Sequence, residues 1–260
     1  MDEACAVCLE SRGEAVTLPC KHVFCRSCVL RLKQYAIYRC PLCRAELPMD
    51  PEERRAEHAK RAVSEGVREL IRATSGERVD EELLSRSIEK LEEAVKLDDS
   101  NLAAKVALSN AWAQRNPDRA LSLAEECVKR SKCAASLATL GLALEKSNRI
   151  NDAIEQYERA VRRDSNHFYA HASLGMLLFK VKRFEDSIKM FDRTIEISPP
   201  NDPTFYFNKA LALEAANRRE EALLAYKTAI ATDSNHYPSH MNLGHLLLNI
   251  SPRDAARYFE

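Results

Sequence analysis

Eight cysteine and histidine residues in the first 43 positions constrain the fold more than any other feature of the chain. Their spacing is C-x2-C, eleven residues, C-x-H-x2-C-x2-C, eleven residues, and C-x2-C. These four close ligand pairs are enough for two tetrahedral sites of mixed thiolate and imidazole, a donor set that suits zinc. The eight residues are Cys5, Cys8, Cys20, His22, Cys25, Cys28, Cys40 and Cys43.

The two predicted zinc ions are structural. Eight protein ligands for two ions leave no open position at which a water molecule could be activated. A segment of about 45 residues is also too short to bury a self-sufficient core, whereas one structural zinc site supplies on the order of 10 kcal/mol of folding free energy. The segment is therefore expected to be unfolded without metal.

A disulfide scaffold is the competing interpretation of such dense cysteines. The framework has seven cysteines, an odd number, and a histidine stands where the eighth ligand is needed. Met1, Asp2 and Glu3 lead directly into the first ligand without the pattern of a secretory signal, so export to an oxidising compartment is not expected. Zinc accounts for the pattern and disulfides do not.

In this order of ligands, residues 5 to 47 resemble the RING finger family in its C3HC4 form. The resemblance implies interleaved zinc sites, in which the first and third ligand pairs share one ion and the second and fourth pairs share the other. One zinc ion would then be held by Cys5, Cys8, Cys25 and Cys28, and the second by Cys20, His22, Cys40 and Cys43.

The same resemblance implies a RING-type ubiquitin ligase, which docks a ubiquitin-conjugating enzyme charged with ubiquitin and forms no covalent intermediate itself. Family positions for the docking groove fall on Val7, Leu32 and Pro41. Arg44 falls on the position of a basic linchpin, where a planar guanidinium can satisfy carbonyl groups on two proteins at once. Three further apolar residues are expected to pack the zinc core without touching a partner: Leu18, Phe24 and Leu42.

Past residue 48 the composition changes from cysteine-rich to charged and alanine-rich. Asp50 can cap a helix, and a proline followed by two glutamates suits its first turn, so a helix is predicted from about residue 51 to 73. A second helix is predicted from Asp80 to Leu97, where apolar residues recur at steps of three and four. Its buried face is expected to hold Leu83, Leu84, Ile88, Leu91, Ala94 and Val95.

The remainder repeats at steps of 34, 35 and 34 residues, beginning with the pairs Leu140-Gly141 and Leu174-Gly175. Small residues where two helices approach closely, with aromatic residues between them, resemble tetratricopeptide repeats. The resemblance is strong from residue 134 onward and implies an all-α solenoid. Predicted domains are 1–48 (RING), 49–133 (linker helix and divergent repeats) and 134–260, divided into 134–167, 168–202, 203–236 and an incomplete 237–260.

Two earlier, divergent repeats are also predicted, although their first helices lack the Leu-Gly pair. Their second helices are indicated by two sets of small or apolar residues at the repeat spacing. Roughly five helical pairs are therefore expected, because one pair cannot bury its apolar face alone. The two sets are Ser87, Leu91, Ala94 and Ala120, Ala124, Cys127.

The resemblance implies that the first helix of each repeat lines a concave groove for a substrate or adaptor. Asn208 and Asn242 stand where such proteins hold a ligand's backbone, since a carboxamide donates and accepts together. The sequence does not show the lysine and asparagine clamp with which chaperone-binding members of this family hold a terminal carboxylate. Other residues expected in the groove are Phe207, Leu211, His245, Met176 and Ser173.

The composition excludes some functions and leaves others open. Lysine plus arginine equals aspartate plus glutamate at 39 each, so no net charge favours nucleic acid, and no apolar run is long enough for a membrane. The expected location is cytoplasmic or nuclear. The primary hypothesis is a RING-type ubiquitin ligase with a recruiting solenoid; the alternatives are a non-catalytic assembly scaffold and a co-chaperone that hands clients to degradation.

Overall fold

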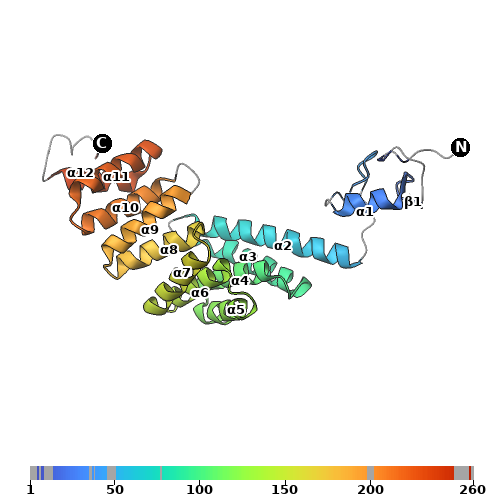
Figure 1. Cartoon of the computed structure of the whole chain (residues 1–260), viewed down its shortest axis with the longest axis horizontal. Helices are drawn as coiled ribbons and strands as arrows, with labels where there is room; N and C mark the ends of the chain where they lie inside the picture. Colours follow the sequence, from blue (N-terminus) through green and yellow to red (C-terminus); the bar gives the residue numbers. More distant parts are fainter. Residues whose placement is uncertain are drawn as a thin grey trace.

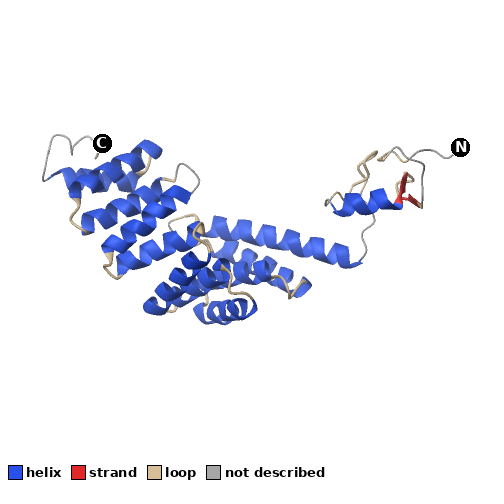
Figure 2. Ribbon diagram, in the orientation of Figure 1, coloured by secondary structure: helices blue, strands red, loops and turns tan. Residues whose placement is uncertain are grey.

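The structure, a computed structural model, describes residues 5, 7–8, 14–34, 37, 39–45, 51–76, 78–197, 202–248 and 258. A small N-terminal unit is followed by a row of helices that reaches the C-terminal end (Figure 1). The two strands of the described residues both lie in the N-terminal unit (Figure 2). This confirms the predicted fold class, a small zinc-finger domain followed by an all-α solenoid.

The N-terminal unit is built on a short hairpin and one helix. Strand β1 (Ala15–Thr17) pairs antiparallel with β2 (Val23–Cys25), with Val16 opposite Phe24, and helix α1 (Arg26–Gln34) follows β2 directly. Leu18 and Phe24 are almost fully buried among the cysteines, which confirms their predicted packing role. So small a core agrees with the expectation that metal must stabilise this unit.

The prediction that Leu42 packs the zinc core was wrong, because its side chain is 56% exposed. Leu42 lies in the turn between two ligands, Cys40 and Cys43. Both sulfur atoms must face a common point for a metal to be held, so the turn leaves the residue between them on the outside. Its apolar character is therefore available to a partner.

Eleven helices follow the N-terminal unit in the described residues. Successive helices pack against each other as pairs, from α2 with α3 to α10 with α11, and each pair packs on the next (Figure 1). Their bounds are α2 Pro51–Thr74, α3 Glu81–Leu97, α4 Leu102–Ala113, α5 Pro117–Arg130, α6 Ala134–Lys146, α7 Ile150–Arg163, α8 Phe168–Lys180, α9 Phe184–Ile197, α10 Pro203–Ala215, α11 Arg219–Thr232 and α12 Tyr237–Leu248.

The start of helix α3 follows the helix-capping rules. The Asp80 carboxylate accepts hydrogen bonds from the amides of Glu82 and Leu83, each at 3.0 Å, and caps α3. Side-chain caps satisfy amide groups that have no partner inside the helix. The helices predicted at residues 51 to 73 and from Asp80 to Leu97 are confirmed as α2 and α3.

The two helices of a repeat can lie close together where the first helix has a glycine. A Cβ atom added at Gly141 would lie 2.9 Å from the ring of Tyr157, and one at Gly175 would lie 3.1 Å from the ring of Phe191. Glycine therefore lets the two helices approach closely where a large ring fills the space between them. This confirms the expected close approach of small residues to aromatic ones.

Helix α2 contains a glycine of the same kind, which the sequence prediction did not find. A Cβ atom added at Gly66 would lie 2.6 Å from Leu91, and the Ser87 hydroxyl donates to the Gly66 carbonyl at 2.7 Å. Ser187 makes the same bond to Gly175 at 2.8 Å. Ser87 follows Gly66 by 21 residues, whereas Ser187 follows Gly175 by 12. The α2–α3 pair is therefore a repeat unit with a longer connection.

Predicted turns inside the repeats are confirmed by one recurring backbone feature. Asn148, Lys182 and Asn217 all adopt left-handed conformations, with φ between 60° and 62°. Asparagine tolerates this region better than most residues, which suits a tight turn after each first helix. The second helix predicted for the last repeat lies outside the described residues. None of the described helices is long and apolar enough to cross a membrane.

Candidate functional site

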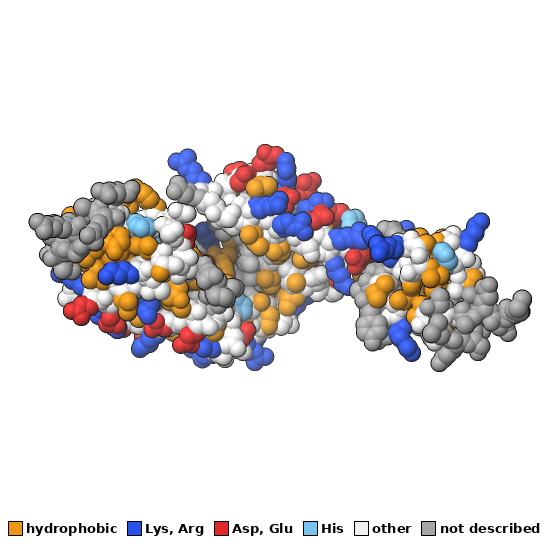
Figure 3. Space-filling model, turned by 90° about the horizontal axis from the view of Figure 1, so that it is seen from above, with side chains coloured by type: hydrophobic (Ala, Val, Ile, Leu, Met, Phe, Trp, Pro, Cys, Tyr) orange, Lys and Arg blue, Asp and Glu red, His pale blue; other side chains and the backbone are white. Residues whose placement is uncertain are grey.

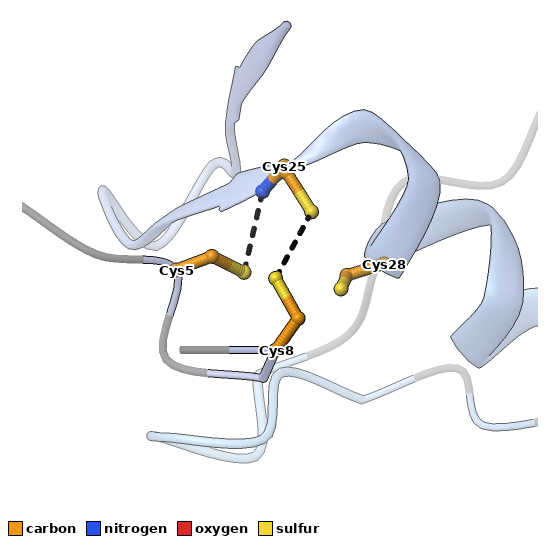
Figure 4. Close-up of side chains that lie close together, drawn as sticks. All are labelled: Cys5, Cys8, Cys25 and Cys28. Atoms are coloured by element: carbon orange, nitrogen blue, oxygen red, sulfur yellow. Dashed lines mark hydrogen bonds between the residues drawn. The ribbon is translucent and has the colours of Figure 1, made fainter. Parts of the chain in front are cut away.

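The first ligand cluster joins a loop, the end of β2 and helix α1 through Cys5, Cys8, Cys25 and Cys28 (Figure 4). The sulfur atoms of Cys8 and Cys25 are 3.8 Å apart, and the Cys25 amide donates to the Cys5 sulfur at 3.5 Å. All four sulfur atoms lie within 4.8 Å of one another. Ligands from separate segments can therefore share one ion and hold the segments together.

The second cluster contains Cys20, His22, Cys40 and Cys43, and its ligand atoms also lie within 4.8 Å of one another. The Nδ1 atom of His22 is 3.4 Å from the Cys20 sulfur and 3.7 Å from the Cys40 sulfur. Along the chain, the pairs alternate between the two clusters. The structure thus brings together the two interleaved sets that the family resemblance implied.

The donor atoms of both clusters fit zinc. In the first cluster, the neighbouring Cys25 thiol and then burial raise the pKa of Cys28, because crowded sulfur atoms cannot all carry charge without a cation. A divalent ion removes this penalty and takes all four thiolates as ligands. Each cluster provides four protein donors, which corresponds to a closed, structural site. The two clusters can hold two zinc ions.

The residues expected to dock a conjugating enzyme come from three segments next to the ligands. Val7 is 39% exposed and stands immediately before Cys8, and Pro41 is exposed beside Cys40. Leu32 on α1 is half-buried and packs partly against the zinc core. Hydrophobic side chains gather on the visible face of this N-terminal unit (Figure 3). Leu42, next to Pro41, adds to the exposed apolar area.

Arg44 is fixed at its backbone and exposed at its side chain. Its amide donates to the Cys40 carbonyl at 2.8 Å, and the Cys40 amide donates to the Ala45 carbonyl at 2.7 Å. Its φ of 61° lies in the left-handed region, which is unfavourable for a residue with a Cβ atom. The last zinc-binding turn therefore holds the Arg44 backbone in one conformation while the guanidinium faces solvent.

Residues expected in the groove lie on the first helices α8, α10 and α12. Asn208 and Asn242 are half-buried, whereas Met176 is 49% exposed and His245 is also exposed. Two of the predicted residues contact the solenoid itself. The Phe207 ring lies 6.0 Å from the ring of Tyr226 and 5.4 Å from that of His236, and Leu211 packs on the core of the last repeats.

Sequence reasoning did not select Tyr169, although it shares a helix face with Ser173 and Met176. Its side chain is 47% exposed, and its spacing of four and seven residues from those two was the available signal. An ion pair between Lys180 and Glu145, at 2.6 Å, also joins neighbouring first helices and was not expected. Both features adjoin the predicted groove.

Fold and metal clusters together define a protein with a zinc-stabilised N-terminal domain and a helical repeat solenoid. Residues 1–48 match the family model "Zinc finger, C3HC4 type (RING finger)". Residues 107–166, 138–202 and 173–237 match the family model "Tetratricopeptide repeat". The chain belongs to the tetratricopeptide-repeat proteins and carries a C3HC4 RING finger at its N-terminus.

Two of the curated relatives that match the N-terminal part of the chain are named as ubiquitin ligases. E3 ubiquitin-protein ligase TRIM56 of Homo sapiens is 43% identical over 49 residues, which cover 19% of this chain and 6% of that protein. E3 ubiquitin-protein ligase RNF146 of Rattus norvegicus is 50% identical over 46 residues, covering 18% of this chain and 13% of that protein. The chain thus spans a small fraction of each relative. Its RING domain is homologous to those of E3 ubiquitin ligases.

Solved structures match the repeats and establish the fold alone. The pilF protein of Pseudomonas aeruginosa superposes with a TM-score of 0.64 at 18% identity, covering 78% of this chain and 90% of that one. TTC0263, a thermophilic TPR protein of Thermus thermophilus, gives a TM-score of 0.60 at 15% identity and covers 73% of this chain and 99% of that one.

Proposed function

We propose that the protein is a RING-type E3 ubiquitin ligase that acts in the cytoplasm or nucleus. In this proposal, the RING docks a ubiquitin-charged conjugating enzyme and the repeats recruit a protein substrate or adaptor. The observation that carries the proposal is the pair of closed ligand clusters, which leave an apolar surface and one fixed arginine exposed beside them. Neither cluster has a position for substrate, so transfer takes place on the bound partner.

Val7, Leu32 and Pro41 form the docking surface in this proposal, and Leu42 extends it. The surface is apolar and its segments are fixed by zinc, so little conformational entropy is lost when a partner binds. Removing two methyl groups from Val7 costs at most about 1.6 kcal/mol of binding free energy, which is a loss of affinity of up to roughly fifteenfold.

Arg44 would donate hydrogen bonds to ubiquitin and to the conjugating enzyme at the same time. Its guanidinium carries five donors, and its backbone is already held in place. Hydrogen bonds from a charged group contribute about 1.5–3 kcal/mol, so loss of the side chain should slow transfer roughly tenfold to a hundredfold.

A panel of conjugating enzymes tests the proposal through ubiquitin-chain formation by the purified chain. Wild type should form chains with at least one enzyme, and Val7→Ala and Arg44→Ala should both form fewer. Leu30→Ala is the matched control for Val7, since Leu30 is an exposed apolar residue on α1 outside the docking set. Absence of chains across the panel, with two zinc ions bound, would refute the ligase.

A scaffold that assembles other proteins is the second candidate. It is favoured by Leu30 and Ile37, which are 58% and 45% exposed on the RING and are not assigned to enzyme docking. Such residues suit self-association through the RING. Sedimentation analysis that finds a dimer of wild type and a monomer of Leu30→Ala, without ubiquitin transfer by either, would select this function.

A further inference from the structure

Two repeats of the solenoid contain the same polar set with one difference. A step of 69 residues separates Tyr157 from Tyr226 and Glu145 from Glu214. The same step relates two residues of the following first helices, Ser173 on α8 and Asn242 on α12. In the repeat between them, Phe191 and Phe179 occupy the tyrosine and glutamate positions, so the hydroxyl and the carboxylate are lost together.

In the later repeat the tyrosine hydroxyl is satisfied inside the protein. The Tyr226 hydroxyl donates to the Glu214 carboxylate at 2.9 Å. Burial and Glu214 raise the pKa of Tyr226, while the nearby Asn242 side chain lowers it. Tyrosine, glutamate and asparagine together complete the polar set.

The earlier repeat has the same tyrosine without these partners. Tyr157 is fully buried, and its hydroxyl makes no hydrogen bond within the described part of the chain. Glu145 is paired instead with Lys180, at 2.6 Å. Ser173 lies near the Tyr157 hydroxyl and lowers its pKa against the larger effect of burial, but its side chain is two heavy atoms shorter than asparagine. A buried hydroxyl without a partner is costly.

Tyr169 provides access to this hydroxyl. Its side chain is 47% exposed, and it lies one helical turn before Ser173 on the same face of α8. Half-exposed side chains change rotamer on the picosecond to nanosecond timescale. Tyr169 can therefore turn aside and open a path to Tyr157 from the surface beside α6 and α8, which contact each other.

We propose that Tyr157, Glu145, Ser173 and Tyr169 form a subsite that binds the carboxamide of an asparagine or glutamine side chain of the recruited protein. The inference rests on the proposed recruiting function and names its chemistry. A carboxamide oxygen accepts from the Tyr157 hydroxyl, and its NH2 group donates to Glu145. A carboxylate has no N–H to donate to Glu145, and an ammonium offers no acceptor to the hydroxyl. Ser173 has a shorter side chain than Asn242, which stands at the same position of the later repeat.

A random linear peptide library, displayed on phage and selected on the full chain, tests the subsite. Selected peptides should share an asparagine or glutamine, and replacing it with leucine should weaken binding measured by fluorescence anisotropy. Tyr157→Phe removes one hydrogen bond and should weaken binding about threefold to tenfold. Ser173→Asn fills the subsite and should weaken binding at least as much while raising the thermal midpoint of the repeats.

Tyr226→Phe is the matched control, because its hydroxyl already has a partner, and it should retain the selected peptides. Circular dichroism verifies that each variant is folded. Selected peptides without a shared carboxamide, or peptides bound equally by Tyr157→Phe and Ser173→Asn, would overturn the subsite and leave recruitment standing. Failure to select any peptide would overturn both the subsite and recruitment through this groove, while ubiquitin transfer by the RING would be judged separately.

Discussion

Arg44 allows the side chain and the backbone of one position to be tested separately. Its φ of 61° costs a residue with a Cβ atom about 1–2 kcal/mol, a cost that glycine does not carry. Arg44→Ala keeps this cost and removes the guanidinium, whereas Arg44→Gly removes both. Because folding of the RING is coupled to zinc binding, Arg44→Gly should hold zinc about fivefold to thirtyfold more tightly than Arg44→Ala.

A chelator titration with a chromogenic zinc indicator measures this difference, and single-turnover assays measure transfer. Both variants should lose transfer to a similar degree, although their zinc affinities differ. Loss of zinc from Arg44→Ala would mean that the side chain stabilises the fold. Normal transfer by Arg44→Gly would refute the linchpin role, since that variant keeps the turn and lacks only the side chain.

Chelation of zinc should unfold the RING while leaving the helical circular dichroism of the repeats nearly unchanged, and a cooperative loss of both would show that the two parts fold together. Gly141→Ala gains about 1 kcal/mol of helix propensity but forces a Cβ atom against Tyr157, which costs about 1–3 kcal/mol. The thermal midpoint of this variant should therefore fall. Gly175→Ala, whose added Cβ atom would lie 3.1 Å from the Phe191 ring, should be near neutral. Lys105, 3% exposed and 2.7 Å from Asp99, holds the pKa of that carboxyl below its usual 3.8. The pair therefore stabilises the repeats above about pH 4 and loses this contribution as the pH falls. In Lys105→Met, the thermal midpoint should decrease less than in wild type when the pH is lowered below about 4.

The metal site and the repeats were predictable from sequence because their signals are local or periodic. Ligand spacing fixes which side chains can meet at an ion, and a step near 34 residues fixes which helix faces stack. Gly66 was missed because a longer connection separates the two helices of its repeat. It lies 21 residues before Ser87, whereas Gly175 lies 12 residues before Ser187. Its contact with Leu91 becomes visible only in three dimensions.

Other features depend on geometry that residue types do not encode. Leu42 was predicted to be packed because it is apolar, but the turn between two ligands directs it outward. The unpartnered Tyr157 hydroxyl depends on which way one carboxylate points, since Glu145 pairs with Lys180 while Glu214 accepts from Tyr226. Sequence identifies such residues as equivalent, and the structure distinguishes them.

In the proposed function, the RING activates a ubiquitin-charged conjugating enzyme through Arg44. Single-turnover discharge of ubiquitin from the charged enzyme onto free lysine tests it without any substrate at the repeats. Wild type should accelerate discharge, Arg44→Ala should be roughly tenfold to a hundredfold slower, and Arg31→Ala, which changes an exposed arginine on α1, should match wild type. If zinc-loaded wild type does not accelerate discharge with any conjugating enzyme tried, the RING does not act as a ligase.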